Sequence, residues 1–307
     1  MKQCVLCKEK QFDILFPHHN NWKMGKCLSC GFVQVVPMPS AKEIGELYHE
    51  DFDHFTPYIE QLAVHHAYFK QKVEEIGWKI KAMPAGRQDL RFKKKTNIIV
   101  NPTSYLSNLT LLDIGCAMGV TLDEAKKKGM KVVGIDLSAD AVTYCRKKGF
   151  TCYNGTVQSL GAKLKPGSFA VVTAFQVVEH ERDPLTMMKQ VRTLLVDDGL
   201  VVLATPNYGG FWRRVMGRKW FGFAHPEHVV LFDHDTMRQL LEKAGFRDIE
   251  VRADSPRPFP LSFAFTRGSD YFPWLAWLLR PMGKMLDRFD IKNPINPWDD
   301  MIAFGRK

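Results

Sequence analysis

The chain has 307 residues, of which 45% are apolar and 25% charged, and this composition excludes a disordered or fibrous protein. Its length suits one large domain and one small one, and no uninterrupted apolar run is long enough to span a membrane. The net charge of +10 favours acidic partners such as phosphates, nucleotides, nucleic acid or anionic lipid.

The cysteines and the N-terminal residues indicate the cellular compartment. There are seven cysteines, an odd number, and four of them form two close pairs with metal-type spacing, which suggests a reducing environment. The first residues lack the apolar stretch of a signal peptide. We therefore expect a cytoplasmic protein.

Residues 1–39 contain two Cys-x-x-Cys turns, formed by Cys4 with Cys7 and by Cys27 with Cys30. Each turn directs two thiolates at one ion, and two such turns complete a tetrahedral zinc site. A closed site of four cysteines is structural because it leaves no position for a substrate. We predict a zinc ribbon over 1–39; redox-active pairs are the alternative, and a ribbon can also bind nucleic acid.

Residues 40–108 are predicted to form a helical arm followed by a basic linker. Ser40 and Glu43 have capping-box spacing, and a second helical stretch runs from about 57 to 78. Seven cations against one acid lie between 79 and 95 in a Pro- and Gly-containing segment, which is typical of a solvated loop or of a phosphate-binding linker.

Residues 109–307 alternate between apolar runs and helical patterns, which is typical of βαβ units around a parallel sheet. The expected helices cover 121–128, 139–148, 184–195 and 236–244. The expected strands cover 111–114, 131–135, 151–153, 169–175, 200–204, 249–252 and 301–304. We predict a doubly wound α/β fold with a seven-stranded Rossmann-like sheet.

The stretch from Leu111 to Gly119 is a buried strand followed by a turn of the form Gly-x-Ala-x-Gly that opens a helix. Asp113 just before the first glycine would repel a pyrophosphate on the helix N-terminus, so it suits a ligand that carries a positive charge. Asp136 ends the next strand, where an acid can accept hydrogen bonds from both hydroxyls of a ribose.

These residues resemble class I S-adenosylmethionine-dependent methyltransferases over about 109–307. Asp113, Gly115 and Gly119 match the first motif of that family, with Ala117 in place of its middle glycine, and only a slight tightening is expected there. The resemblance implies that S-adenosylmethionine is bound by Asp113, Gly115, Ala117, Gly119, Asp136, Leu137, Thr156, Phe175 and Gln176.

Two further signals place the chain within the family. Glu179-His180-x-x-Asp183-Pro184 is similar to ubiquinone-biosynthesis-type O-methyltransferases, and the Cys4 ribbon followed by a helical arm resembles deoxysugar C-methyltransferases. Gln176 occupies the position of an additional glutamate in metal-dependent relatives, so no catalytic metal is expected.

Two ionisable groups follow predicted strands, Glu179-His180 and His225-Pro226-Glu227-His228. Histidine suits proton removal from a hydroxyl or carbon acid at neutral pH. By resemblance to the deoxysugar enzymes, His180, Glu227 and His228 are the candidate catalytic residues. We expect His228 to be the base, Glu227 to orient it and His180 to position the acceptor. The alternative is structural, with Glu179 capping a helix and His228 anchoring a loop.

The resulting hypothesis is methyl transfer to a small, anionic acceptor, a saccharide or nucleotide-linked sugar, at carbon or oxygen. One alternative is an rRNA or tRNA methyltransferase that binds RNA with the ribbon and the basic linker. A second is a non-enzymatic binding module with a vestigial cofactor site. Residues 208–223 are a candidate lid over an anionic acceptor, a peripheral membrane contact or a packed helix. The sequence does not predict the oligomeric state.

Overall fold

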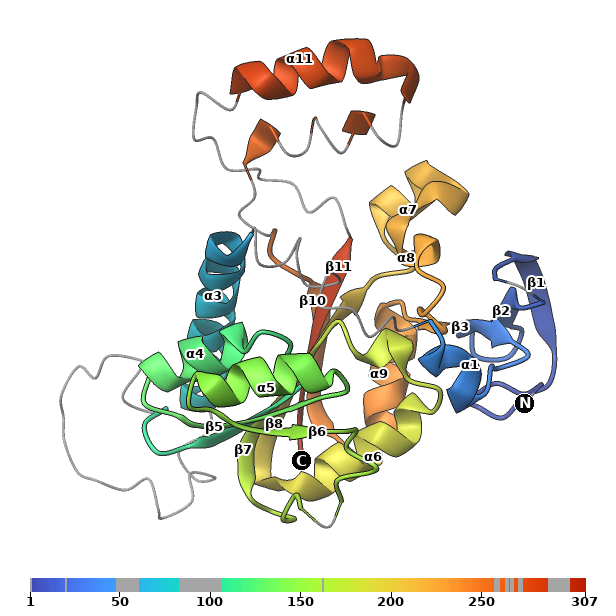
Figure 1. Ribbon diagram of the computed structural model, residues 1–307. Helices are drawn as coiled ribbons and strands as arrows, with labels where there is room; N and C mark the ends of the chain where they lie inside the picture. The colour runs from blue at the N-terminus through green and yellow to red at the C-terminus, as the bar shows by residue number, and fades with distance from the viewer. Residues whose placement is uncertain are drawn as a thin grey trace.

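A computed structural model shows how the chain is arranged (Figure 1). It describes residues 2–19, 21–47, 61–82, 106–161, 163–256, 260–262, 265, 268–269, 273–286 and 299–307. Most of the predicted basic linker, 83–105, and the start of the second helical stretch, 57–60, lie outside the described residues.

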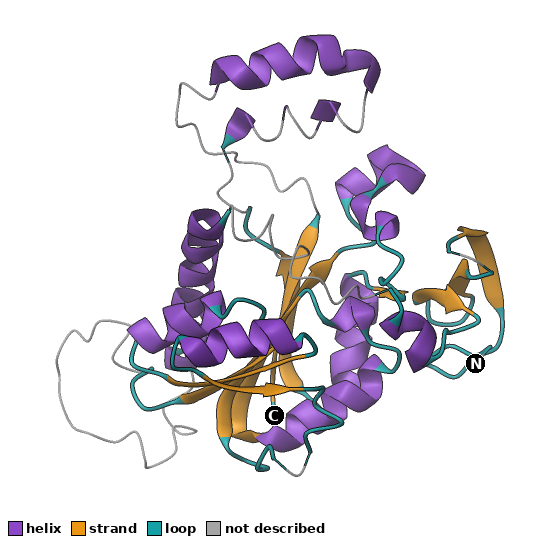
Figure 2. Cartoon of the chain, viewed as in Figure 1, coloured by secondary structure: helices purple, strands orange, loops and turns teal. Residues whose placement is uncertain are grey.

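Seven strands form the central sheet in the order β10-β11-β8-β7-β4-β5-β6 (Figure 2). Their bounds are Thr110–Ile114 (β4), Lys131–Asp136 (β5), Thr151–Asn154 (β6), Phe169–Phe175 (β7), Leu195–Pro206 (β8), Arg247–Ala253 (β10) and Asp300–Arg306 (β11). The strands from β8 to β6 are parallel, and β11 is antiparallel to both of its neighbours. The predicted seven-stranded Rossmann-like sheet is confirmed.

Strand β8 begins five residues earlier than the pattern predicts. The expected start was Leu200, but the strand begins at Leu195, which pairs with Phe169 of β7. Residues 195–199 include two acids and a glycine, so the apolar run that signals a buried strand is interrupted there.

Helices cover both faces of the sheet. Their bounds are Leu62–Lys81 (α3), Val120–Lys127 (α4), Ala139–Lys147 (α5), Pro184–Leu194 (α6) and His234–Lys243 (α9). Adjacent strand residues point to opposite faces. Leu111 belongs to the buried cluster that contains residues of α3, α4 and α5, whereas Leu112 belongs to the cluster that contains residues of α6 and α9.

The described part of the segment between the ribbon and the sheet contains helices α1 and α3. Helix α1 (Ala41–Gly45) starts at the predicted capping box: Ser40 Oγ accepts from Glu43 N–H, and the Glu43 carboxylate accepts from Ser40 N–H. Helix α3 buries Val73 and Ile76 in the core beside α4. It therefore packs on the sheet, and the division of the chain at 39 and 108 stays a prediction.

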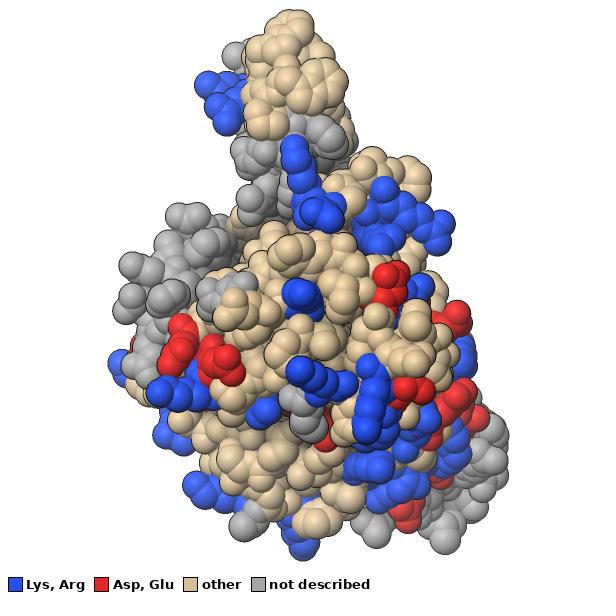
Figure 3. Space-filling model, turned by 90° about the vertical axis from the view of Figure 1, so that its right-hand side faces the viewer, with Lys and Arg blue, Asp and Glu red and all other residues tan. Residues whose placement is uncertain are grey.

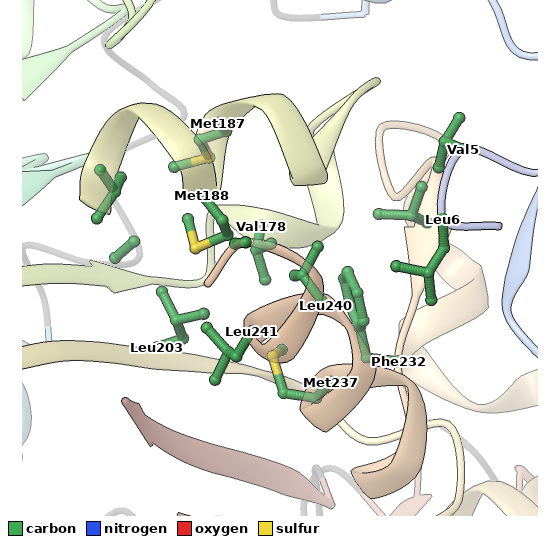
Figure 4. Packing of buried hydrophobic residues seen from close by; sticks show 14 of the residues in the cluster. Val5, Leu6, Val178, Met187, Met188, Leu203, Phe232, Met237, Leu240 and Leu241 are labelled. Atoms are coloured by element: carbon green, nitrogen blue, oxygen red, sulfur yellow. The ribbon is translucent and has the colours of Figure 1, made fainter. Parts of the chain in front are cut away.

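The N-terminal residues form a second, smaller sheet. Its strands are β1 (Phe12–Pro17), β2 (Lys23–Cys27), β3 (Val33–Val36) and β9 (Val230–Leu231), in that order. Strand β9 belongs to the C-terminal half of the chain, so the ribbon sheet is completed by the larger domain. Val5 and Leu6 of the ribbon lie beside Phe232 in the shared core (Figure 4).

Two helical segments lie at one end of the molecule. One consists of α7 (Phe211–Met216), a 3₁₀ turn η5 (Gly217–Lys219) and α8 (Phe221–Ala224). The other, η6 (Pro273–Leu275) with α11 (Ala276–Leu286), projects from the body (Figure 1). Among the described residues no helix is both long enough and apolar enough to cross a membrane.

Candidate active site

Strand β4 leads into the turn 115–119, which opens helix α4. Gly115 and Gly119 have positive φ angles of 70° and 73°, a conformation that glycine adopts without strain. A Cβ at Gly115 would lie 2.5 Å from Cγ2 of Val177, so the turn and the loop after β7 are in close contact. This backbone can approach a ligand closely.

Ala117 at the centre of the turn also has a positive φ angle, of 43°. The left-handed region costs a residue with a Cβ about 1–2 kcal/mol. The backbone N–H of Ala117 donates to Oδ2 of Asp136 at 2.8 Å, which helps to hold this conformation. The alanine is therefore accommodated with local strain in the turn.

Asp136 joins the turn to the end of β5. Its Oδ2 accepts from Ala117 and its Oδ1 accepts from the N–H of Ser138 at 2.8 Å. Burial raises the pKa of this carboxyl, although the two N–H donors oppose the shift. Each carboxylate oxygen can accept a further hydrogen bond, which is what ribose hydroxyls require. Leu137, the next predicted cofactor residue, is exposed.

Asp113 lies deeper than we expected for a residue that faces a charged ligand. Its side chain is 2% exposed, and Oδ1 accepts from the hydroxyl of Thr173 on β7 at 2.6 Å. Burial raises its pKa to about 7, and hydrogen bonds from Thr173 and Thr121 oppose the shift. Asp113 thus braces the strands beneath the turn.

The remaining predicted cofactor residues surround the same strand ends. Thr156 accepts at Oγ1 from the N–H of Ser159, and the Phe175 ring lies 5.4 Å from that of Phe69 on α3. Gln176 has a φ angle of 58°, and its Nε2 is buried with no hydrogen-bond partner among the described residues. An unsatisfied buried amide donor fits a site completed by a polar ligand.

His180 and His228 meet after β7 and before β9. Their ring centroids are 4.9 Å apart and the rings are nearly perpendicular. His228 donates from Nδ1 to the carbonyl oxygen of Gly222 at 3.0 Å, and His180 donates from Nδ1 to the carbonyl oxygen of Glu227 at 3.2 Å. We assign these directions because a carbonyl can only accept, so Nε2 is the basic nitrogen of each neutral ring.

The electrostatics favour a neutral His228. Burial lowers its pKa well below the usual value, and the neighbouring rings of His180 and His225 lower it further. Its side chain is only 6% exposed. An imidazole in this setting is unprotonated at neutral pH and can accept a proton.

The role expected for Glu227 differs from what the geometry shows. Oε1 of Glu227 lies 3.2 Å from Nδ1 of His225, and the backbone carbonyl of Gly222, not this carboxylate, orients His228. The hydrogen bond with His225 helps to lower the pKa of Glu227 to about 2 against the opposing effect of burial. Sequence proximity suggested Glu227 as the partner of His228, but residues 226–227 form a turn in which the N–H of His228 donates to the carbonyl oxygen of His225.

Glu179 was not among the catalytic residues expected from the sequence, but the fold brings it into this cluster. Glu179 is fully buried, and its Oε2 accepts from the hydroxyl of Thr205 at 2.9 Å. Single ligand atoms of Glu179, His180 and His228 all lie within 4.8 Å of one another. The structural alternative for Glu179 was to cap the helix that follows it. That helix, α6, is capped by Asp183. The Glu-His pair was the only signal of this arrangement.

The four N-terminal cysteines lie together as a tetrahedral site requires. Sγ of Cys4 is 3.6 Å from that of Cys30, and Sγ of Cys7 is 3.5 Å from that of Cys27. All four sulfurs are within 4.8 Å of one another, and none is in a disulfide. Four sulfurs at about 2.3 Å from a zinc ion would be separated by about 3.8 Å, so the geometry fits zinc.

Residues 208–223 combine an anchored part with an exposed one. Trp220 is fully buried against Phe223, whereas Phe211 and Val215 of α7 are 65% and 53% exposed. Arg213 donates to the hydroxyl of Tyr208 at 2.6 Å. The segment is therefore packed against the body at Trp220 and exposed along α7.

Comparison with known proteins identifies the class. A family model described as a methyltransferase domain matches residues 78–251. The ubiquinone biosynthesis O-methyltransferase of Burkholderia pseudomallei (strain 1710b) is 22% identical over 182 residues, covering 56% of this chain and 78% of that protein. The enzyme of the same name from Cereibacter sphaeroides is 30% identical over 170 residues, covering 52% and 68%.

A solved structure has the same fold. The S-adenosylmethionine-dependent methyltransferase from Thermotoga maritima superposes with a TM-score of 0.51 at 16% identity, covering 83% of this chain and 98% of its own. The fold and the turn thus define an S-adenosylmethionine-dependent methyltransferase, which binds that methyl donor. The family model spans more than half of the chain, and the chain belongs to the methyltransferase domain family.

Proposed function

We propose that the enzyme methylates a small anionic acceptor, a saccharide or nucleotide-linked sugar, at an oxygen or carbon that His228 deprotonates. The observation that carries this proposal is the pair of imidazole rings of His180 and His228, whose centroids are 4.9 Å apart. The loop that bears His180 contacts the glycine turn through Val177 and Gly115. The proposed base is thus linked to the proposed cofactor turn through His180 and Val177.

Bound S-adenosylmethionine supplies an electrophilic methyl group. The protein must hold the acceptor and remove its proton. Because Nδ1 of His228 is committed to the Gly222 carbonyl, Nε2 is the atom that receives the proton. His180, whose ring lies against that of His228, positions the acceptor by hydrogen bonding.

The cluster must also stabilise the imidazolium that proton transfer forms. The buried Glu179 has a ligand atom within 4.8 Å of those of both histidines. A carboxylate in a region of low dielectric stabilises a cation more strongly than it does in water. Glu179 thus offsets part of the burial penalty on charged His228.

Cations in the segment that precedes Gly222 suit an acidic acceptor. Gly222, which accepts from His228, follows a segment with four cations, Arg213, Arg214, Arg218 and Lys219. In Figure 3 the upper, projecting end of the molecule carries Lys and Arg side chains, and acidic side chains are visible only below them. Phosphate or carboxylate groups of an acceptor would be attracted to this surface.

Assignment of the acceptor needs a chemical experiment. Purified protein would be incubated with methyl-labelled S-adenosylmethionine and cell extract separated into water-soluble anions, lipids and RNA. Label in the water-soluble anions, absent with His228→Asn, supports the proposal. Label confined to lipid or to RNA contradicts it.

A lipophilic phenol is the second candidate acceptor. It is favoured by the similarity to enzymes named for ubiquinone biosynthesis, and by the exposed Phe211, Val215, Trp274 and Trp277 at one end of the molecule. In this case 208–223 and α11 would contact a membrane surface. Co-sedimentation with anionic liposomes that is lost with Phe211→Ser and Trp277→Ser supports this candidate.

RNA methylation rests on the ribbon and on the basic linker, most of which lies outside the described residues. No base-stacking platform is evident in the sequence of the basic run. RNA binding that weakens steeply with salt, together with label in the RNA fraction, would favour this alternative.

A further inference from the structure

The three cysteines outside the ribbon converge beneath the proposed cofactor turn. Cys116 lies in the turn after β4, Cys145 on α5 and Cys152 on β6. All three side chains are buried, and their sulfur atoms lie within 4.8 Å of one another. The sequence placed them 29 and seven residues apart, so only the fold brings them together.

The surroundings of the cluster are apolar and tight. A Cβ built at Gly134 on β5 would lie 2.7 Å from Sγ of Cys116 and 2.9 Å from Sγ of Cys152. The same Cβ would be 2.9 Å from a methyl group of Leu122. The metal-binding group formed here by described residues contains three thiols and neither imidazole nor carboxylate. Such a donor set selects soft cations over hard ones.

A set of three sulfurs suits copper in its lower oxidation state. Thiolates select Cu(I), zinc and iron–sulfur clusters. Structural zinc sites and iron–sulfur clusters take four protein ligands, whereas the described residues of this cluster offer three sulfurs. Among these soft ions, Cu(I) therefore fits the cluster best.

We propose that Cys116, Cys145 and Cys152 form a three-sulfur site for Cu(I), and that its occupation weakens the binding of S-adenosylmethionine. Three sulfurs at about 2.3 Å from one ion, taking the length of a zinc–sulfur bond as a guide, are separated by about 4.0 Å. That separation lies within the observed limit of 4.8 Å. On binding, the coordinating thiols release their protons to solvent, and no electron is transferred.

The coupling follows from contacts between the cluster and the turn. Sγ of Cys145 donates to the carbonyl oxygen of Ala117 at 3.3 Å, and it lies 2.9 Å from the position of a Cβ on Gly119. A copper-bound thiolate has no proton to donate, so Ala117 would lose this bond and the turn would shift. This inference rests on 115–119 being the cofactor turn. Linkage then requires the cofactor to weaken copper binding by the same factor.

The test uses the full-length, reduced protein with zinc supplied to the ribbon, under anaerobic conditions. Cu(I) would be added from a bicinchoninate complex, and the affinity for S-adenosylmethionine measured by calorimetry with and without copper. We expect copper to weaken cofactor binding at least tenfold in the wild type. In Cys152→Ala, which lacks one of the three sulfurs, one equivalent of copper should be lost and cofactor affinity should change less than twofold on adding copper.

A matched variant distinguishes copper bound at the three-cysteine cluster from copper bound at the ribbon. Cys7→Ala leaves the three-cysteine cluster intact, so its cofactor affinity should still fall tenfold with copper. Cys145→Ala provides a second cluster variant, and melting curves establish that each protein is folded. Equal copper binding by wild type and both cluster variants would overturn the site. Unchanged cofactor affinity after copper has filled the site would overturn the coupling. If the proposed acceptor is wrong, only the methyl-transfer assay without copper would show it, and the copper and cofactor binding results would be unaffected.

Discussion

His228 donates its Nδ1 proton to the carbonyl oxygen of Gly222 across 3.0 Å, and this bond fixes which nitrogen faces the proposed acceptor. The Gly222 carbonyl belongs to α8, so the cation-bearing segment and the proposed base are held together. A replacement that keeps the donor but lacks a basic nitrogen can test the role of His228 without removing this bond.

His228→Asn should lower turnover by about 10²–10⁴-fold, the usual contribution of a general base. The Asn amide can still donate to Gly222, so cofactor affinity and melting temperature should change little. His225→Asn is the matched control, because the His225 side chain is 52% exposed and lies outside the proposed proton path. Steady-state kinetics and calorimetry would measure both. Normal turnover by folded His228→Asn would remove His228 from catalysis.

The pH dependence follows from the lowered pKa of His228. The base must be unprotonated, so activity is lost as the pH falls through a pKa well below 6.5. We therefore expect that protonation of His228 causes no loss of kcat/KM between pH 8 and pH 6.5. His228 binds a proton near pH 6.5 in the unfolded chain, but only at lower pH in the folded chain. The contribution of His228 to the free energy of unfolding is therefore full above pH 6.5 and decreases as the pH falls below 6.5. An acid limb centred above pH 6.5 would contradict the assignment.

Asp136→Ala should weaken S-adenosylmethionine binding by about 1.5–3 kcal/mol, the scale of hydrogen bonds to a charged group. The change removes the predicted ribose acceptor and also the carboxylate that holds the N–H of Ala117. Asp140→Ala, an exposed acid on the next helix, is the control and should bind normally. Calorimetric titration that finds equal affinities for the two variants would exclude Asp136 from the site.

The sequence predicted the sheet well because parallel strands are buried on both faces and appear as apolar runs, as in Phe169–Phe175. It could not predict the pairing of β9 with β3, since Val230–Leu231 is too short to give a pattern and its partner is about 200 residues away. The same reason applies to Glu179, whose burial among His180, His228 and Thr205 depends on three separate segments.

Ala117→Gly should stabilise the protein by about 0.5–1 kcal/mol, because glycine relieves the left-handed strain but makes the unfolded chain more flexible. The φ angle of 43° at Ala117 is the basis for this expectation. Urea unfolding in the absence of cofactor measures the change. Ala125→Gly in helix α4 is a contrasting variant and should destabilise by about 1 kcal/mol or more. Equal destabilisation by both would show that the turn is not strained.

The ribbon is expected to hold one zinc ion per chain, and its removal should affect catalysis. Val35 of β3 donates to the carbonyl oxygen of Val229, and Val229 in turn donates to the carbonyl oxygen of Glu179. These bonds connect the ribbon to the loop beside His228. Site and fold form together in small zinc modules, so chelation should loosen β3 and displace this loop.

Chelation should therefore reduce kcat at least tenfold, while cofactor affinity changes less than threefold, because the hydrogen bonds from the ribbon run to Val229 and Glu179 and not to the glycine turn itself. Zinc restored in stoichiometric amount should recover the activity, and Cys7→Ser should reproduce the loss without chelator. Metal analysis of the purified protein comes first: a chain without zinc would refute the ribbon assignment. Full turnover by a zinc-depleted enzyme would instead show that the ribbon does not support the catalytic loop.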